Sequence, residues 1–544
     1  MTLFERILAA RGLTTRATRE AFLQPDYVAV KHDPFLLPDM KKAVARLKQA
    51  REQGEKIVIY GDYDIDGLSA TALLLDAFGK FGFEGVDAFI PNRFVEGYGM
   101  TMGAVDKVRD MGADLIVTVD TGSLCHAEIA YAASLGIDTV VTDHHNVAET
   151  PPPSVAAVNP KFSGHTYPFR DLCGAGVAFK LVQALQTELD GLPDGYEKWL
   201  LDLVALGTVC DIVTLADENR ANVYWGLEVL KKQQRPGLKA LMAVAGIEPE
   251  QVNARHLGFG LGPRMNAAGR LETAQHALDM LTARDGLAAL EASEKLEELN
   301  IKRGIQDAIF EEACVQAEQL ADDRVLVVSS GGWNHGVIGI VASKLVEKYK
   351  KPVFIIGERG EEATGSARSF GDFSAADAVR AADDIIIKGG GHGAAAGVTL
   401  ETEKIDDFRR RVNEFYDSLQ LTNQERYLLP RADVEIDDFS EIDEELVANL
   451  AKMEPFGNGN PEPVLKIATA NVLSVRRMGT DGQHVKLALR DKNGTVLQML
   501  AFNAPEEFFR DPGDEVAAWF QPTINEWQGV RTVEGRLLHV SSAE

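Results

Sequence analysis

Three acidic side chains crowd one short segment of the chain. The segment DYDIDG, residues 62–67, places Asp62, Asp64 and Asp66 directly after the apolar run at residues 57–60. Because these carboxylates repel one another, their grouping indicates that a cation holds them together. A solvated acidic turn is the alternative, since Asp and Gly are common in turns. A calcium loop of the EF-hand type is not favoured, because no Glu stands at its twelfth position and no helix precedes it.

Two further acidic motifs follow apolar runs. Asp120 comes directly after LIVTV, and Asp143, His144 and His145 come directly after TVVT. A carboxylate beside an imidazole suits a transition metal such as manganese. Neighbours on an extended chain point to opposite sides, so we expect one histidine to bind metal and the other to face the substrate. The alternatives are a helix-capping Asp120 and an ordinary surface loop for the histidine pair.

A fourth acidic residue, Asp211, stands in the apolar segment ALGTVCDIV. Burying its carboxylate is costly unless it is paired or binds a cation, so a helix cap or a buried salt bridge is the alternative. Taken together, the four motifs have the composition of a two-metal site. Such a site can activate water and stabilise an in-line displacement at phosphorus.

The elements that must position these motifs are short strands and helices in alternation. The runs at 57–60, 115–119 and 139–142 are rich in β-branched residues, and helix-prone segments separate them. This alternation predicts a parallel α/β sheet. Ligands bind such sheets outside the carboxyl ends of the strands, where the first three motifs fall.

The second half of the chain carries glycine-rich segments with cationic or hydroxyl side chains. GGGHGAAAG contains His392, GSARS contains Ser366 and Arg368, and GPRMNAAGR ends in Arg270. Small residues let a backbone approach a phosphate closely, and guanidinium groups bind phosphate oxygens. Tight turns are the alternative for each segment, so only their combination favours a phosphate pocket.

The predicted fold class is α/β, with two α/β domains and a C-terminal β-barrel. A long, charged, helix-prone stretch runs from about residue 272 to about 320, and LALRDKNGTVLQML predicts a hairpin around Asn493-Gly494. Several such strands suggest an OB-fold. The expected divisions are an N-terminal segment (1–45), a catalytic α/β domain (46–225), a helical connector including a long helix (226–322), a second α/β domain (323–425) and the barrel (426–544).

Composition restricts the setting of the protein. The formal net charge of −26 argues at first against nucleic acid as a binding partner, unless bound metal ions and a locally basic groove offset that charge. The four cysteines are far apart, so a zinc site or a disulfide framework is not expected and a reducing cytoplasm is the simplest location. We expect no membrane segment, no signal peptide and a monomer.

The motifs resemble those of a known family. DYDIDG, DTG, DHH and GTVCDIV, in this order, resemble the four motifs of DHH phosphoesterases, and GGGHGAAAG resembles the hallmark of the second domain of that family. GPRMNAAGR, GWNHGVIGIVASKL, GSARS and MEPFGNGNPEP resemble segments of the RecJ-type members. The resemblance extends from about residue 35 to the barrel. One departure is Thr121, which follows Asp120 where the family often has Asn.

The resemblance implies roles for individual residues. Metal ligands would be Asp64, Asp66, Asp120, His144 and Asp211, with Asp62 as an adjacent candidate. Asp143 would orient His144, and His145 would contact the scissile phosphate. Further phosphate contacts would come from Arg270, Ser366, Arg368 and His392. Candidate nucleic-acid contacts in the barrel are Arg476, Arg477, Lys486, Trp527 and Arg531.

The resemblance also implies an activity: metal-dependent exonuclease digestion of single-stranded DNA, 5′→3′, to 5′ mononucleotides. The expected cofactors are two divalent ions, manganese first and magnesium as the alternative. DNA recombination and repair would be the context, with a helicase and a single-strand-binding protein as partners. One competing hypothesis is a small-substrate DHH phosphodiesterase for oligoribonucleotides or cyclic dinucleotides. The other is a scaffold without activity, which the presence of every ligand type disfavours.

Overall fold

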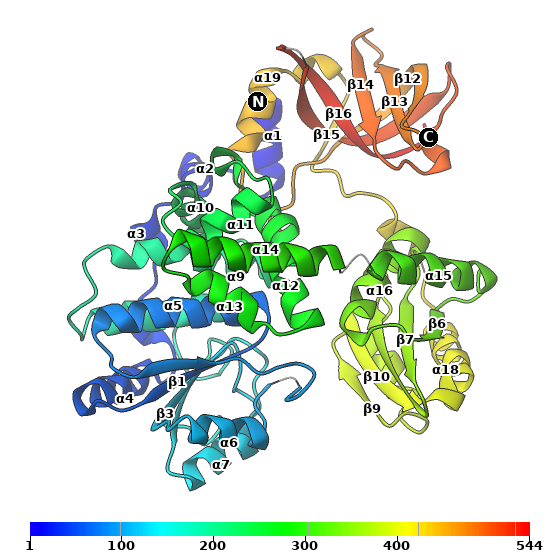
Figure 1. Ribbon diagram of the computed structural model, residues 1–544. Coiled ribbons are helices and arrows are strands. Elements are labelled where there is room, and N and C mark those ends of the chain that lie inside the picture. The colour runs from blue at the N-terminus through cyan, green and yellow to red at the C-terminus, as the bar shows by residue number, and fades with distance from the viewer. Residues whose placement is uncertain (98, 303–304, 423, 528, 544) are drawn as a thin grey trace. The chain divides into compact units, whose positions relative to one another are not determined.

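The computed structural model describes residues 1–97, 99–302, 305–422, 424–527 and 529–543. The chain divides into two compact units, one formed by Met1–Glu298 with Arg431–Glu544 and the other by Leu299–Pro430 (Figure 1). In the described part of the chain, no helix is both long enough and apolar enough to span a membrane.

The first unit contains the predicted parallel sheet. Its strands, in sheet order, are β2 (Val86–Phe89), β1 (Ile57–Gly61), β3 (Leu115–Val119), β4 (Asp138–Thr142) and β5 (Ala156–Val158). All four pairings are parallel. Strands β1 and β3 are buried throughout, because helices cover both faces and leave no side for polar residues. The prediction of a parallel α/β sheet is confirmed.

Helices cover the sheet on both faces. On one face, α6 (Met102–Asp110) and α7 (His126–Ser134) form a core with alternate residues of the central strands, such as Val58 and Ile116. On the other face lie α5 (Ile65–Phe81), α8 (Gly174–Gln186) and α4 (Met40–Gln53). Both α5 and α8 are buried along most of their length, so their first turns are held firmly beside the carboxyl ends of the strands.

A second group of helices packs behind α5. It consists of α9 (Leu201–Cys210), α10 (Asp217–Lys231), α11 (Pro236–Val244), a π-helical segment (His256–Leu261), α12 (Gly262–Leu271) and α13 (Gln275–Thr282). The charged stretch predicted as a long helix consists of α13, α14 (Gly286–Lys302) and α15 (Ile305–Gln319). Residues 303–304 lie outside the described part of the chain.

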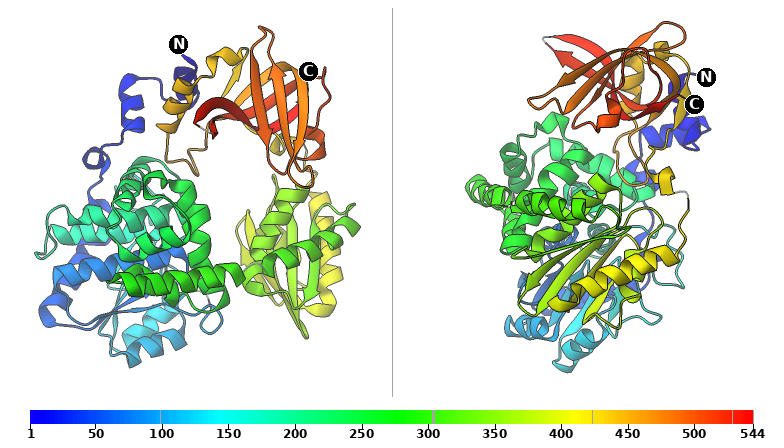
Figure 2. Two further views of the ribbon diagram at one scale, coloured as in Figure 1. Left: turned by 45° about the horizontal axis from the view of Figure 1, so that its top comes forward. Right: turned by 90° about the vertical axis from the view of Figure 1, so that its right-hand side faces the viewer.

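The second unit is built on a mixed sheet. Its strands, in order, are β6 (Leu326–Gly331), β7 (Val353–Arg359), β8 (Glu362–Arg368), β10 (Ala395–Glu401) and β9 (Lys388–Gly391). The pair β6–β7 is parallel and the other pairs are antiparallel. One face packs against α15 and α16 (His335–Tyr349), and the other against α17 (Ala375–Arg380) and α18 (Ile405–Ser418). Figure 2 shows α18, in yellow, running along its face of this sheet.

The C-terminal strands form the predicted barrel. They are β11 (Val434–Ile436), β12 (Leu465–Met478), β13 (His484–Arg490), β14 (Val496–Ala501), β15 (Glu515–Trp527) and β16 (Val530–Ser542). Pairing of β12 with β15 closes the ring through β13, β14 and β16. The predicted hairpin around Asn493-Gly494 is confirmed as the β13–β14 turn. The predicted fold class is thus confirmed.

The N-terminal segment contributes to the barrel core. Leu3, Ile7 and Leu8 of α1 (Leu3–Ala10) are buried together with barrel residues and with α19 (Glu444–Ala451). Arg6 of this helix pairs with Glu441 at 3.0 Å. Helices α2 (Arg16–Leu23) and α3 (Tyr27–Val30) follow. The first helix therefore belongs with a barrel that lies more than four hundred residues later in the chain.

Candidate metal centre

The acidic motifs meet at the carboxyl edge of the parallel sheet. Asp62, Asp64 and Asp66 lie on the turn from β1 into α5, Asp120 follows β3, and His144 and His145 follow β4. Asp211 comes from a helix instead of a strand, because it caps the C-terminus of α9. Three sets of side chains each have ligand atoms within 4.8 Å of one another: Asp62, Asp64 and Asp120; Asp66, His144 and Asp211; Asp120, His144 and His145.

The imidazole of His144 lies among three carboxylates. Its Nε2 atom is 3.0 Å from Asp120 Oδ1, 3.5 Å from Asp211 Oδ2 and 3.7 Å from Asp66 Oδ2. His144, Asp66 and Asp120 are buried. Burial lowers the pKa of His144, so the imidazole favours its neutral form, in which a ring nitrogen can bind a metal.

Asp120 provides the clearest test of whether a cation fits. Neither of its buried carboxylate oxygens has a hydrogen-bond partner, and the same is true of His144 Nε2. Its backbone also has a left-handed conformation, with φ of 61°, which non-glycine residues seldom adopt. Buried polar atoms are normally satisfied, so these orphaned ligand atoms indicate that the residues fit a divalent cation.

Two helix N-termini hold the other carboxylates in place. Asp64 Oδ1 caps α5 by accepting from the amides of Asp66 and Gly67 at 2.9 and 3.1 Å. Asp66 accepts from the first amides of α8, those of Gly174 and Ala175, the latter at 2.9 Å. The positive ends of both helices therefore orient carboxylates at the site.

Crowding makes the full ionisation of this site costly without a counter-ion. Burial, followed by the charges of Asp66 and Asp64, raises the pKa of Asp120 well above its ordinary range. Burial also raises the pKa of Asp62, Asp66 and Asp211, with neighbouring carboxylates adding to the effect. A bound divalent ion would reverse this balance by favouring the ionised forms.

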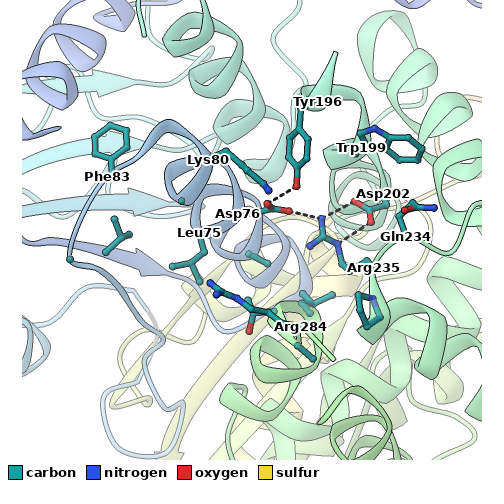
Figure 3. Close-up of a pocket in the computed structure, with 18 residues that line it drawn as sticks. Leu75, Asp76, Lys80, Phe83, Tyr196, Trp199, Asp202, Gln234, Arg235 and Arg284 are labelled. Carbon is teal, nitrogen blue, oxygen red and sulfur yellow. Dashed lines mark hydrogen bonds and ion pairs between the residues drawn. The ribbon is translucent and has the colours of Figure 1, made fainter. Parts of the chain in front are cut away.

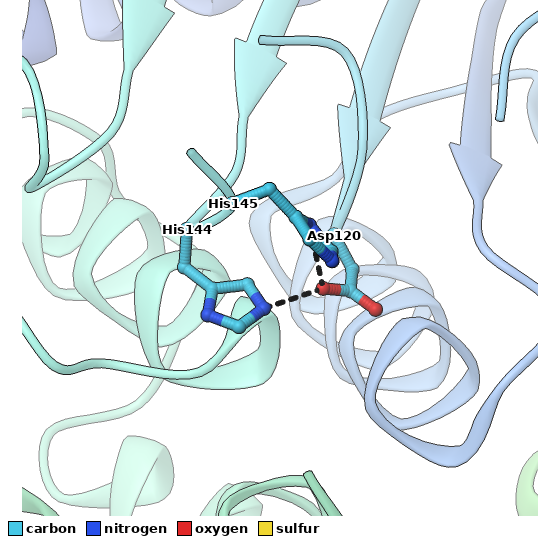
Figure 4. A group of neighbouring side chains, drawn as sticks. All are labelled: Asp120, His144 and His145. Carbon is cyan, nitrogen blue, oxygen red and sulfur yellow. Dashed lines mark ion pairs between the residues drawn. The ribbon is translucent and has the colours of Figure 1, made fainter. Parts of the chain in front are cut away.

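The sequence suggested that the side chains of His144 and His145 point to opposite sides. In the structure they do not. Both rings face Asp120, with His145 Nδ1 at 3.8 Å from its Oδ1, and the ring centroids are 4.6 Å apart (Figure 4). The alternation rule fails here because β4 ends at Thr142 and the chain bends. The amides of His144 and His145 both donate to Asp143 Oδ1, at 2.7 and 3.0 Å.

Asp143 contacts the ring of His145, whereas we predicted that it orients His144. The distance from His145 Nδ1 to Asp143 Oδ1 is 2.9 Å. Burial lowers the pKa of His145, but the hydrogen bond and charge of Asp143 outweigh it and raise that pKa to about 9. Burial likewise opposes ionisation of Asp143, yet the hydrogen bond and charge of His145 lower its pKa. His145 is the more exposed of the two histidines, which suits a residue that meets substrate.

A cavity of about 270 Å³ opens beside the acidic turn. Its walls include Asp62, Asp64, Asp66 and Asp211 together with the predicted phosphate residue Arg270. Arg93 and Asn266 also line it, and we did not single out either from the sequence. Arg93 lies over the ring of Tyr63, 4.4 Å from its centroid. Arg264 from the same motif as Arg270 has a structural role, since it pairs with Glu297 at 2.5 Å.

A larger cavity of about 910 Å³ lies along the later turns of α5 (Figure 3). Arg235 on its wall pairs with Asp202 at 2.9 Å and with Asp76 at 3.3 Å, and Tyr196 donates to Asp76 at 2.9 Å. These charges neutralise one another, and none of the clustered candidate metal ligands lines this cavity, whereas four of them line the smaller one. We therefore assign the chemistry to the smaller cavity.

In the second unit, the predicted phosphate residues gather on neighbouring strands. Ser366 and Arg368 lie on β8, and Arg368 donates to Ser366 Oγ at 3.1 Å. Ser366 pairs across the sheet with Gly397 of β10, and His392 is exposed in the turn between β9 and β10. No carboxylate pairs with Arg368 among the residues that the structure describes, and burial lowers its pKa. Its charge is therefore available for an anion.

Most of the barrel residues that we predicted to contact nucleic acid form ion pairs within the protein. Lys486 pairs with Glu534 at 2.6 Å, Arg477 pairs with Glu506, and Arg531 pairs with Glu444 at 3.3 Å. Arg476 has no ion-pair partner in the described ranges, and the side chain of Trp527 lies outside them. Phe502, which we did not single out, is 64% exposed beside His484. Role assignments on this surface stay predictions.

The fold and the site define a metal-binding protein of the DHH class. Residues 56–208 match the family model described as the DHH family, N-terminal domain. Residues 322–418 match the DHHA1 domain, and residues 432–539 match the RecJ OB domain. The three matches fall in turn on the parallel sheet, on the mixed sheet of the second unit and on most of the barrel.

Within that class, the chain belongs to the RecJ family. It is 35% identical over 528 residues to the single-stranded-DNA-specific exonuclease RecJ of Salmonella typhimurium, covering 92% of this chain and 89% of that protein. It is 39% identical over 527 residues to the RecJ of Bacillus subtilis, covering 96% of this chain but 65% of that protein. A crystal structure of RecJ in complex with Mn²⁺ from Thermus thermophilus has a TM-score of 0.82 and 30% identity, covering 99% of this chain and 76% of that chain.

Proposed function

We propose that the protein is a divalent-metal-dependent exonuclease that hydrolyses single-stranded DNA from the 5′ end and releases 5′ mononucleotides. The observation that carries the proposal is the buried cluster around His144, where unpartnered carboxylate and imidazole atoms lie beside a cavity lined by Arg93 and Arg270. Carboxylates and a histidine suit a divalent metal, and guanidinium groups suit the phosphates of a strand.

The side chains divide into two sets for a pair of ions. Asp62, Asp64 and Asp120 form one set of three ligand residues, and Asp66, His144 and Asp211 form another that shares no member with it. We propose that each set would hold one ion, with manganese as the preferred metal. Asp120, whose Oδ1 lies 3.0 Å from His144 Nε2, would contribute to both sites. When bound, such ions supply Lewis-acid activation of water and neutralise charge at phosphorus.

The chain's own residues bind and position the substrate. In hydrolysis, the water oxygen bonds to phosphorus as the P–O3′ bond breaks, and the proton that the water loses balances the proton that the departing O3′ gains. His145, held by Asp143 at 2.9 Å and half-exposed, can donate a hydrogen bond to the scissile phosphate. Arg93 and Arg270 can grip neighbouring phosphates from the cavity wall. Ser366, Arg368 and His392 offer further phosphate contacts from the second unit.

Two labelled oligonucleotides test the proposal. The purified protein is incubated with Mn²⁺ and one single strand labelled at its 5′ end, and with the same strand labelled at its 3′ end. We expect immediate release of a labelled mononucleotide from the first and a gradually shortening ladder from the second. An intact long strand with rapid cleavage of a dinucleotide would instead make the protein a small-substrate phosphodiesterase.

Replacement of Arg270 tests the phosphate-binding wall. Arg270→Gln should raise KM for a 5′-phosphorylated single strand about tenfold or more, because a charge-assisted hydrogen bond to phosphate contributes about 1.5–3 kcal/mol. Arg93→Gln should act in the same direction. Steady-state kinetics at saturating Mn²⁺ give the result, with Arg109→Gln on the exposed face of α6 as the control. An unchanged KM in both cavity variants would remove these arginines from the substrate site.

DNA recombination and repair is the context that we propose for this activity. A helicase would supply single strands, and a single-strand-binding protein would share the substrate.

A further inference from the structure

The turn that presents Asp211 needs support that its own sequence does not supply. Ile212, the next residue, has φ of 60° and is 69% exposed. A β-branched side chain in the left-handed region is strained, and an exposed one gains little burial to offset that strain. Because the Asp211 carboxylate lies 3.5 Å from His144 Nε2, a small shift of this turn would move a candidate metal ligand.

Asp171 and Asn219 hold Thr214 through hydrogen bonds of 2.9 and 3.0 Å, and the support at the two ends of the turn comes from Asn458, which lies in the segment between α19 and β12. Its side-chain amide donates to the carbonyl of Ile212 at 2.8 Å. Its backbone carbonyl accepts a hydrogen bond from the backbone amide of Leu215, also at 2.8 Å. One residue therefore bridges both ends of the stretch 212–215. Asn458 lies far along the chain from that stretch, in the motif MEPFGNGNPEP at residues 453–463. No residue of this motif belongs to the metal cluster.

The glycines on either side of Asn458 permit this close approach. A Cβ atom on Gly457 would lie 2.8 Å from Leu215 Cδ1, and one on Gly459 would lie 2.5 Å from Thr214 Cγ2. Gly459 also has φ of 77°, which favours glycine. The sequence Gly-Asn-Gly at 457–459 is thus fitted to the surface of the turn after Asp211.

Buried polar groups fix the segment that carries Asn458. Arg220 of α10 donates to the carbonyls of Met453, Glu454 and Pro455 at 3.1, 2.9 and 3.3 Å. Asn460 donates to the carbonyls of Met453 and Pro455 at 2.9 and 2.8 Å. Asn458 itself is exposed, so its side chain adds little to the core. Arg220 and Asn460 therefore anchor the segment, whereas Asn458 contacts the turn after Asp211.

We infer that Asn458 is a positioning residue for Asp211. It holds the turn 212–215 in the conformation that keeps the Asp211 carboxylate beside His144, and through it the segment leading into the barrel supports the metal centre. This inference rests on the proposed function, in which Asp211 is a metal ligand. It predicts that metal affinity depends on a residue that contacts neither the metal nor the substrate.

Mn²⁺ titration calorimetry on the whole 544-residue chain tests the inference. Asn458→Ala should weaken Mn²⁺ binding about fivefold, as expected for loss of one ordinary hydrogen bond. Asn458→Asp, which turns a carboxylate toward the Ile212 carbonyl, should weaken it at least as much. Hydrogen exchange at residues 212–215 should become faster in both variants. The Mn²⁺ concentration for half-maximal turnover should rise while kcat at saturating Mn²⁺ stays near that of the parent.

Two comparison variants separate the possible failures. Asn525→Ala, an exposed asparagine on β15, should leave Mn²⁺ affinity unchanged. Asp211→Asn should lower that affinity strongly. If Asp211→Asn has no effect, the ligand assignment in the proposed function is wrong. If Asp211→Asn weakens binding but both Asn458 variants bind Mn²⁺ like the parent, the positioning role of Asn458 is overturned.

Discussion

Replacing Asp120 with asparagine is expected to abolish turnover and, at the same time, to stabilise the metal-free protein. Both carboxylate oxygens of Asp120 are buried without a hydrogen-bond partner, and burial with the charges of Asp66 and Asp64 raises its pKa. Losing a shared ligand should lower kcat at least about 10³-fold, because metal stabilisation of the transition state contributes several kcal/mol. Asparagine keeps the shape of the residue but removes one negative charge from the cluster.

The change in melting temperature tests the role of Asp120 more specifically than the loss of turnover does. In EDTA, the parent must bury Asp120 next to the carboxylates of Asp66 and Asp64, whereas Asp120→Asn removes this crowding of like charges, so the variant should melt at a higher temperature. In Mn²⁺, the parent should gain stability because ligand binding favours the folded state, and the variant should gain little. Thermal melts in EDTA and in Mn²⁺ measure both effects.

Asp481→Asn serves as the matched control, because this exposed aspartate lies in the turn between β12 and β13. It should have the activity and both melting temperatures of the parent. If Asp120→Asn kept near-normal activity, or melted below the parent in EDTA, the view of Asp120 as a metal ligand crowded by like charges would be wrong.

The sequence predicted the elements whose signals are local. The strands at β1, β3 and β4 were predictable because apolar, β-branched runs precede their acidic motifs, and a buried parallel sheet requires such runs. The turn at Asn493-Gly494 was predictable because its residue types are specific to hairpins. Parallel strands place their carboxyl ends at one edge, so the meeting of Asp66, Asp120 and His144 followed from topology alone.

Other features depend on tertiary contacts that no local pattern encodes. Arg93 follows β2 in an ordinary loop, and only the fold brings it to the wall of the cavity that holds Arg270. Lys486 looked like a nucleic-acid contact, yet it pairs with Glu534, a residue 48 positions away. The rings of His144 and His145 share one side because the chain bends after β4, and periodicity assumes that it does not. The roles of these residues in binding stay predictions.

Gly207→Ala is expected to damage the metal centre although it should favour the helix. Gly207 lies in the interior of α9, where alanine ordinarily stabilises a helix by about 1 kcal/mol relative to glycine. A Cβ atom at this position would lie 2.4 Å from Asp66 Oδ1 and 2.8 Å from Ala175 Cβ. Helices α5, α8 and α9 pack against one another, so the backbone has little room to yield.

The carboxylate of Asp66 must therefore move, and its hydrogen bonds from the first amides of α8 must weaken. A misplacement of about 1 Å can lower turnover about 10²-fold, and we expect a loss of that order with weaker Mn²⁺ binding by calorimetry. Gly79→Ala is the matched control, because Gly79 also lies inside a helix, α5, but its added Cβ would have no atom within 4 Å. It should keep full activity and an equal or higher melting temperature. If the two alanine variants behave alike, close approach to Asp66 is not the reason for glycine at position 207. If only Gly207→Ala loses turnover and Mn²⁺ affinity, the packing of α5, α8 and α9 determines the position of the Asp66 carboxylate.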